Sequence, residues 1–227
     1  MADVVRIVSL VPSITETLAA WNREPVACTR FCERPDLLHV GGTKDPNIAR
    51  IIELAPDLVV VDAEENRRED YDEMIRRGLT VHALRVRSVN DVNAALAELG
   101  ARVGVTWSRI AMPDPRPARI RAFIPIWRRP WMALGAPTYG TSLLNLLGIT
   151  NAFESKGAYP GVTLEEAARA RPDVVLAPSE PYPFTTRQLD ELETVAPTLF
   201  VDGKDLFWWG VRTPSAIERL GHVMESL

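Results

Sequence analysis

Tryptophan is the residue type whose placement most suggests ligand binding in this sequence. Four of the 6 Trp fall in two short segments, one with Trp127 and Trp131 and the other with Trp208 and Trp209. Indole rings give a large planar contact area at a low cost in conformational entropy, and Arg128 beside the first pair adds a planar cationic donor. These residues could supply the apolar face contacts of a ligand site. The alternative is that some of the rings pack between a loop and the core.

Motifs of the common enzyme classes are absent from the sequence. It contains no Gly-Lys-Ser/Thr phosphate loop, no dinucleotide-binding glycine fingerprint and no Gly-x-Ser-x-Gly nucleophile elbow. We therefore expect a binding protein with no catalytic residues. An enzyme in which cleft carboxylates act as acid and base stays open as an alternative, with Asp62, Glu33 and Asp205 as its candidates.

Metal-ligating residues are few and scattered. The 3 His lie far apart, at His39, His82 and His222, whereas metal sites usually draw their ligands from closer clusters. Cys28 and Cys32 are four residues apart with no second pair, so neither a zinc site nor a structural disulfide is supported. We expect reduced thiols, no metal site and no cofactor.

Charge and hydropathy exclude two classes of partner. The 26 basic and 30 acidic residues give a net charge of −4, so no overall positive field favours nucleic acid. No apolar window approaches 18 residues, which excludes membrane insertion. The N-terminal residues lack the basic start and long apolar stretch of a secretory signal. We expect a cytoplasmic protein, or a periplasmic or cell-surface one if the sequence is a processed form.

The first part of the chain alternates between strand and helix patterns. The apolar runs 4–10 and 58–61 read as strands, and Ser13-Ile14-Thr15-Glu16 has the spacing of a helix capping box. Continuous apolar strands between helices are typical of a parallel sheet that is covered on both faces. The sequence predicts an N-terminal α/β lobe over residues 1–87.

A connecting helix and a second lobe are predicted to follow. Apolar residues recur at helical intervals over 88–112, which predicts one long α-helix that ends before Pro113. The alternation then resumes and predicts a C-terminal α/β lobe over 113–227. Pro56-Asp57 and Pro172-Asp173 each separate a helical pattern from an apolar strand. This echo suggests two similar lobes, each with a mainly parallel sheet, although Pro-Asp is also common wherever a helix ends.

Both tryptophan segments follow a predicted strand of the C-terminal half. In open parallel sheets, ligands bind outside the carboxyl ends of the strands. The sequence therefore predicts a ligand site at such an edge.

Four segments carry a resemblance to a known family. They are the stretch Arg6–Glu16, the tripeptide Gly41-Gly42-Thr43, the stretch Asn47–Val61, and the aromatic loop ahead of Pro214. In their order and spacing the chain resembles the helical-backbone (class III) substrate-binding proteins of ABC importers, which serve vitamin B12, haem and iron–siderophore uptake. The vitamin B12-binding branch is the most similar.

The resemblance implies a cobalamin-like or iron-chelate ligand in a cleft between two lobes. Phe31, Asp205 and Phe207 match contact positions of the vitamin B12-binding branch, whereas Leu206, Trp208 and Trp209 depart from it. An acidic position used for permease docking falls on Trp208, and a second falls near Arg68. The ligand contacts that we expect are Ser13, Phe31, Thr43, Trp127, Trp131, Asp205, Leu206, Phe207, Trp208 and Trp209.

These expectations define the partners. We expect a monomeric substrate-binding protein that holds a small metal-chelate ligand and works with an ABC permease. The alternative is a cytoplasmic protein that binds or senses a corrinoid or metal chelate without a permease.

Overall fold

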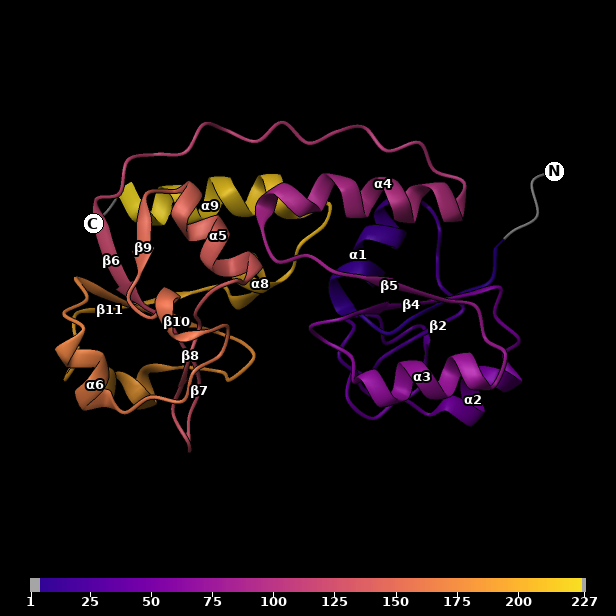
Figure 1. Ribbon diagram of the computed structural model, residues 1–227, viewed down its shortest axis with the longest axis horizontal. Helices are drawn as coiled ribbons and strands as arrows, with labels where there is room; N and C mark the ends of the chain where they lie inside the picture. Colours follow the sequence, from indigo (N-terminus) through magenta and orange to yellow (C-terminus); the bar gives the residue numbers. More distant parts are fainter. Residues whose placement is uncertain (1–4, 226–227) are drawn as a thin grey trace. The chain divides into compact units, whose positions relative to one another are not determined.

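The computed structural model describes residues 5–225, which form two compact units (Figure 1). Of the described residues, unit 1 contains those up to Val86 together with Asp91–Arg109 and Trp209–Val211. Unit 2 contains Arg87–Asn90, Ile110–Trp208 and the remainder from Arg212. No helix in this part of the chain is long and apolar enough to cross a membrane.

Unit 1 is built on a five-stranded parallel sheet with the order β3-β2-β1-β4-β5. Helices α1 and α4 lie on one face of this sheet and α2 and α3 on the other (Figure 1). All five residues of β4 are buried, as a strand covered on both faces requires. The elements are β1 (Ile7–Ser9), α1 (Pro12–Ala20), β2 (Ala27–Cys28), β3 (Leu38–His39), α2 (Ile48–Glu53), β4 (Leu58–Asp62), α3 (Arg68–Arg76), β5 (Val81–Leu84) and α4 (Val92–Val103).

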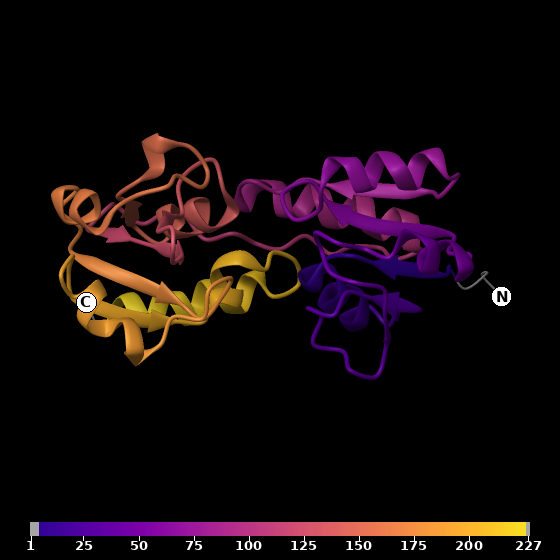
Figure 2. The ribbon, with the colours of Figure 1, turned by 90° about the horizontal axis from the view of Figure 1, so that it is seen from below.

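Unit 2 has a four-stranded parallel sheet with the order β11-β10-β6-β9, and a separate antiparallel pair, β7 and β8. Helix α8 packs against both α5 and α9; α9 is the yellow helix in Figure 2. The strands are β6 (Ile120–Phe123), β7 (Pro125–Trp127), β8 (Met132–Ala133), β9 (Ile149–Asn151), β10 (Val174–Pro178) and β11 (Thr198–Val201). The helices are α5 (Tyr139–Leu146), α6 (Leu164–Arg169), α7 (Leu189–Leu192), α8 (Gly203–Phe207) and α9 (Thr213–Glu225), with 3-10 turns at Val89–Asp91, Glu154–Lys156 and Thr186–Gln188.

The Pro-Asp turn does the same structural work in both units. In unit 1 the Asp57 carboxylate accepts the backbone N–H of Arg6 at 2.7 Å, and the Arg6 guanidinium donates to the carbonyl of Leu54, where α2 ends. In unit 2 the Asp173 carboxylate accepts the N–H of Arg121, also at 2.7 Å.

The match between the two turns extends to the arginine side chain and the backbone. The Arg121 guanidinium donates to the carbonyl of Ala170, where α6 ends. The residue before each Pro, Ala55 or Arg171, has a positive φ, at 44° and 49°. The echo seen in the sequence is therefore a repeated helix–turn–strand unit rather than a chance use of Pro-Asp.

The predicted helix over 88–112 is shorter in the structure. Helix α4 covers only Val92–Val103 and ends at Gly104, whose φ of 70° lies in the left-handed region. The N–H of Val105 then donates to the carbonyl of Gly100 at 2.8 Å, a close approach that a side chain at residue 100 would obstruct. Residues 105–119 form neither helix nor strand.

The segment after α4 belongs to unit 1 as far as Arg109, and Trp107 holds it there. Its indole N–H donates to the side chain of Asn93 at 3.2 Å, and its ring lies 5.5 Å from the ring of Trp21. These contacts hold the segment against α4 and reinforce the early end of the helix. The prediction of one helix over 88–112 was therefore wrong in its extent, because the helix ends at Val103. The lobe boundaries proposed at 87 and 113 stay a prediction.

Substitution of Phe123 tests the assignment of the core of unit 2. Its fully buried ring lies 5.6 Å from that of Phe153, so Phe123→Ala leaves a cavity. We expect the substitution to lower the free energy of unfolding by about 3–5 kcal/mol, measured by urea denaturation followed by circular dichroism. The control is Phe200→Ala on β11, where 41% of the side chain is exposed and the loss should stay below about 1 kcal/mol. Equal losses in both variants would contradict this assignment of the core.

Candidate functional site

Each sheet brings a set of loops together at the carboxyl ends of its parallel strands. In unit 1 these loops follow β1, β2, β3 and β4, and in unit 2 they follow β6 and β10. Such an edge is where ligands bind in open parallel sheets. Of the ten expected contact residues, Ser13, Phe31, Thr43, Trp127 and Trp131 follow β1, β2, β3 or β6, and the other five follow β11.

Four aromatic side chains form one connected cluster at the edge of unit 2, which we call the aromatic platform: Trp127, Trp131, Tyr182 and Phe184. The ring of Trp127 meets Tyr182 edge-on at 5.8 Å, and Tyr182 lies 4.7 Å from Phe184. Phe184 stacks on Trp131 at 5.9 Å with only 7° between the ring planes. Trp127 is 44% exposed at the end of β7, so the platform presents a large apolar ring to solvent.

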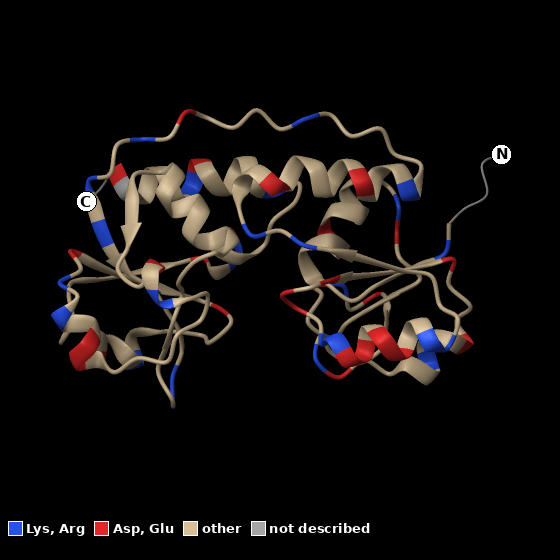
Figure 3. Ribbon diagram, in the orientation of Figure 1, with Lys and Arg blue, Asp and Glu red and all other residues tan. Residues whose placement is uncertain are grey.

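An ion pair holds the hairpin that carries the platform. The Arg128 guanidinium donates to both carboxylate oxygens of Glu191, with Nε at 3.0 Å from Oε2, and lies 6.0 Å from the ring centre of Trp131. The pairing with Arg128 lowers the pKa of the Glu191 carboxyl. The β7–β8 hairpin projects from the sheet in Figure 1 and carries basic residues in Figure 3. A cation fixed beside indole rings suits a ligand that is planar and carries negative charge.

Tyr182 and Phe184 were not among the residues expected from the sequence. They lie in the loop after β10, in Pro181-Tyr182-Pro183-Phe184, directly beyond a fully buried strand. Two aromatic residues alternating with prolines after a parallel strand are the signal that could have identified them.

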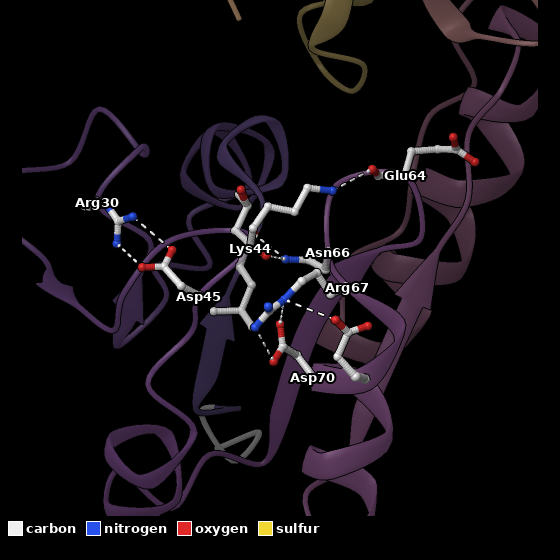
Figure 4. Close-up of polar contacts among 10 residues, drawn as sticks. Arg30, Lys44, Asp45, Glu64, Asn66, Arg67 and Asp70 are labelled. Atoms are coloured by element: carbon white, nitrogen blue, oxygen red, sulfur yellow. Dashed lines mark hydrogen bonds and ion pairs between the residues drawn. The ribbon is translucent and has the colours of Figure 1, made fainter. Parts of the chain in front are cut away.

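In unit 1 the exposed aromatic residue is Phe31, in the loop after β2. Its side chain is 53% exposed, and the Arg30 guanidinium lies 4.8 Å from the ring centre. Arg30 is held by both carboxylate oxygens of Asp45, at 2.9 and 3.0 Å (Figure 4). Phe31 therefore has the exposure that a ligand contact needs.

Asn66 ties three loops of this edge together. Its amide nitrogen donates to the carbonyls of Leu10, at 3.2 Å, and of Thr43, at 2.9 Å, and its amide oxygen accepts the N–H of Asp62 at 2.9 Å. Leu10 lies after β1, Thr43 lies after β3, and Asp62 is the last residue of β4. Beside them, the Lys44 ammonium donates to the carbonyl of Glu64 at 3.2 Å (Figure 4). The edge of unit 1 is thus preorganised by buried hydrogen bonds.

Asp62 is a buried carboxyl group at this edge. Asp62 is only 1% exposed. Its Oδ1 accepts the N–H of Glu64 at 2.7 Å, whereas its Oδ2 has no hydrogen-bond partner among the described residues. Burial raises the pKa of Asp62 to about 7, and the nearby Glu65 and Glu64 add to the rise.

The C-terminal loop residues expected to contact ligand are mostly buried. Asp205 is 2% exposed, and its carboxylate accepts from Arg219 at 2.7 Å and from Arg212 at 3.3 Å. Leu206 is fully buried, whereas Phe207 is half-buried. The structure makes Asp205 the centre of an internal ion cluster that joins α8 to α9.

The adjacent Trp208 and Trp209 belong to different units. Trp208 is 9% exposed in unit 2, with the cations of Lys204 and Arg212 at 5.2 and 5.5 Å from its ring. Trp209 is 5% exposed in unit 1. Both rings contribute to internal packing, as the alternative weighed for the sequence allowed.

Ser13 and Thr43, the two hydroxyl residues expected at the site, are also covered. Ser13 is 5% exposed in the first turn of α1, and its carbonyl accepts the hydroxyl of Thr17 at 2.9 Å. Thr43 is 9% exposed, and its carbonyl is held by Asn66. No group of three or more His, Cys, Asp or Glu side chains that could hold a metal ion occurs within residues 5–225.

The raised pKa of Asp62 makes stability depend on pH. A native carboxyl that keeps its proton up to about pH 7 stabilises the fold below the unfolded pKa, near 3.8, and this contribution is lost as the pH rises through 7. Asp62→Asn retains an oxygen for the Glu64 N–H and has no charge to bury. We expect it to exceed the parent protein in unfolding free energy at pH 8, by on the order of 4 kcal/mol, but not at pH 4. Urea titrations at several pH values measure this.

The control for Asp62→Asn is Asp114→Asn, which removes the same charge at an exposed residue in the segment 105–119. If the two substitutions change the pH profile alike, the burial of Asp62 is not responsible.

Asp205 has a structural role that can be separated from ligand binding. Asp205→Asn removes the charge shared by Arg212 and Arg219, so we expect a loss of about 3 kcal/mol in unfolding free energy without any ligand present. Because Arg219 is itself half-exposed, the loss should fall below that of a fully buried pair. Thermal and urea unfolding measure it, with the exposed Glu218→Gln on α9 as the control. Unchanged stability would contradict the structural role.

No family model matches the sequence. The sequence is 23% identical over 203 residues to the vitamin B12-binding protein of Pectobacterium carotovorum subsp. carotovorum, an alignment that covers 78% of this chain and 72% of that protein. The name of this relative describes a binding protein.

Solved structures match over nearly the whole chain. The periplasmic vitamin B12 binding protein BtuF of Vibrio cholerae superimposes with a TM-score of 0.77 at 18% identity, covering 97% of this chain and 96% of that one. A periplasmic heme binding protein from Pseudomonas aeruginosa also gives 0.77 at 18% identity, over 96% and 91% of the two chains. The cytoplasmic location expected from the N-terminal residues finds no support in these relatives, which are described as periplasmic. The chain has the fold of the helical-backbone (class III) substrate-binding proteins, and the curated relatives that it matches are vitamin B12-binding proteins.

Proposed function

We propose that this chain is a substrate-binding protein for a cobalamin-like or iron-chelate ligand. The observation that carries the proposal is the pair of exposed aromatic surfaces at the carboxyl ends of the strands: Phe31 in unit 1 and the aromatic platform in unit 2. The relatives named for vitamin B12 and for heme support the class of ligand, since both ligands are large, partly planar metal chelates. In keeping with the fold family, the protein partner that we propose is an ABC permease.

The aromatic platform defines the chemistry of recognition in unit 2. The Trp127 ring is 44% exposed while its neighbouring rings are packed. A flat ligand that covers Trp127 buries the remaining apolar surface of the ring, and this burial favours binding. Arg128, fixed by Glu191, adds a cation whose position does not have to be ordered on binding. Trp131 lies deeper and supports the platform through its stack on Phe184.

The edge of unit 1 supplies Phe31 and polar groups. Arg30 and Lys44 place positive charge close to the ring and beside the loop after β4. Together they suit a ligand with an apolar face and peripheral oxygen atoms. Of the residues expected from the sequence, Phe31, Trp127, Trp131 and the half-buried Phe207 are the contacts that we retain. The remaining expected residues act through packing and hydrogen bonds.

The test is a tryptophan-fluorescence titration of the purified chain with cyanocobalamin, hemin and a ferric hydroxamate siderophore. Ligand absorption is corrected for, and each hit is confirmed by calorimetry. We expect saturable binding to one of them at micromolar concentration or below. Trp127→Ala and Phe31→Ala should each weaken it about tenfold or more, since each removes an aromatic anchor.

The matched control is Phe200→Ala, which removes an equally exposed ring within β11 rather than in a loop at the carboxyl edge. Its affinity should equal that of the parent protein. The proposal fails if the folded protein binds none of the three ligands, or if Phe200→Ala weakens binding as much as Trp127→Ala does.

A further inference from the structure

The two cysteines lie together behind the loop that carries Phe31. Cys28 is the last residue of β2, and Cys32 is brought back toward it by a turn in which its N–H donates to the carbonyl of Thr29 at 3.1 Å. Both residues are buried, at 0% and 5% exposure. They are the only Cys in the sequence, and both are free thiols in the structure.

Two threonine hydroxyls converge on the sulfur of Cys32. Thr15 Oγ1 lies 3.1 Å and Thr29 Oγ1 3.3 Å from Sγ. The Thr29 hydroxyl also accepts the N–H of Phe31 at 3.3 Å, which leaves its own proton for the sulfur. Thr29 can therefore donate to the Cys32 sulfur, which favours a thiolate there, whereas the Thr15 hydroxyl also donates to Ser9 Oγ at 2.9 Å and to the Val11 carbonyl at 3.1 Å.

The electrostatics separate the roles of the two thiols. The Cys28 thiol lowers the pKa of Cys32 below its ordinary value, and the hydroxyls of Thr15 and Thr29 lower it further against the effect of burial. The Cys32 thiol and burial raise the pKa of Cys28. A thiolate beside a protonated thiol is the arrangement in which one sulfur reacts first and the other resolves the product.

We propose that Cys28 and Cys32 form a reversible disulfide, with Cys32 as the sulfur that is oxidised first and Cys28 as the resolving thiol. The Cys32 thiolate attacks one oxygen of a peroxide, the O–O bond breaks, and a sulfenic acid and hydroxide form. Cys28 then attacks the sulfenic sulfur, the S–O bond breaks, and water leaves with the thiol proton. In total the two thiols lose two electrons, and one hydrogen peroxide becomes two waters. A dithiol reverses the reaction by exchange.

A disulfide between these residues acts on the Phe31 loop. Residues 29–31 become the interior of a closed ring, and the hydrogen bonds of Thr15 and Thr29 to the free sulfur are lost. Because only 5% of Cys32 is exposed, the oxidant has to be small, as hydrogen peroxide is. This inference does not depend on the proposed ligand, and its test needs none.

The experiment treats the full chain with hydrogen peroxide, then unfolds it in the presence of N-ethylmaleimide and measures the intact mass. Before oxidation we expect two maleimide adducts. After oxidation we expect none, with the chain lighter by two hydrogen atoms and still monomeric, and dithiothreitol should restore both adducts. Retention of two adducts after oxidation, or disulfide-linked dimers only, would overturn the proposal.

Variants assign the order of reaction. In Cys28→Ser we expect Cys32 to stop at a sulfenic acid that dimedone traps, and in Cys32→Ser we expect Cys28 to stay unmodified. Thr29→Val keeps the shape of the side chain and removes a hydroxyl donor, so oxidation of Cys32 should slow several-fold, with Thr198→Val on β11 as the control. Circular dichroism identifies any variant that does not fold. Equal trapping at both cysteines in the folded variants would contradict the assigned roles.

Discussion

Parallel pairing of the strands is the constraint on which both units depend, and a carboxylate contact of the same kind helps to fix it in each. Asp57 and Asp173 each accept a backbone N–H near the start of the neighbouring strand, from Arg6 just before β1 and from Arg121, the second residue of β6. The paired arginines, Arg6 and Arg121, return to the carbonyl where the preceding helix ends. One hydrogen bond of this kind contributes only about 1 kcal/mol. Its effect is to set where the strands begin, and therefore where their carboxyl ends lie.

The carboxyl edge of each sheet sets where the proposed ligand contacts lie, and polar groups fix the loops that carry them. Asn66 joins the loops that follow β1, β3 and β4, and the Arg128–Glu191 pair fixes the hairpin after β6. A ligand that meets loops already ordered in this way does not have to order them on binding. The exposed ring of Trp127 therefore lies on a hairpin that an ion pair orders, and Phe31 lies in the loop after β2 beside the Arg30–Asp45 pair.

The residues expected at the ligand site include exposed ones and buried ones, and the buried ones make internal contacts. Asp205 has the acidic character expected of a polar contact, yet its charge is used by Arg212 and Arg219 to join α8 and α9. Trp208 and Trp209 are adjacent in sequence and belong to different units. Asp62 and Cys32 show the converse, because buried groups that the ligand proposal does not use have altered acidity in unit 1.

The sequence by itself determined the α/β class, the repeated Pro-Asp unit and the place of Trp127 beyond a strand, because these depend on local periodicity and turn chemistry. It could not determine the end of α4, since Trp107 and Val105 contact Asn93 and Gly100 only after the chain has turned back. Nor could it separate Trp127 from Trp209, or identify Tyr182 as the ring that joins Trp127 to Phe184. Exposure and ring contacts arise between segments distant in sequence, so only the tertiary structure decided which aromatic side chains face solvent.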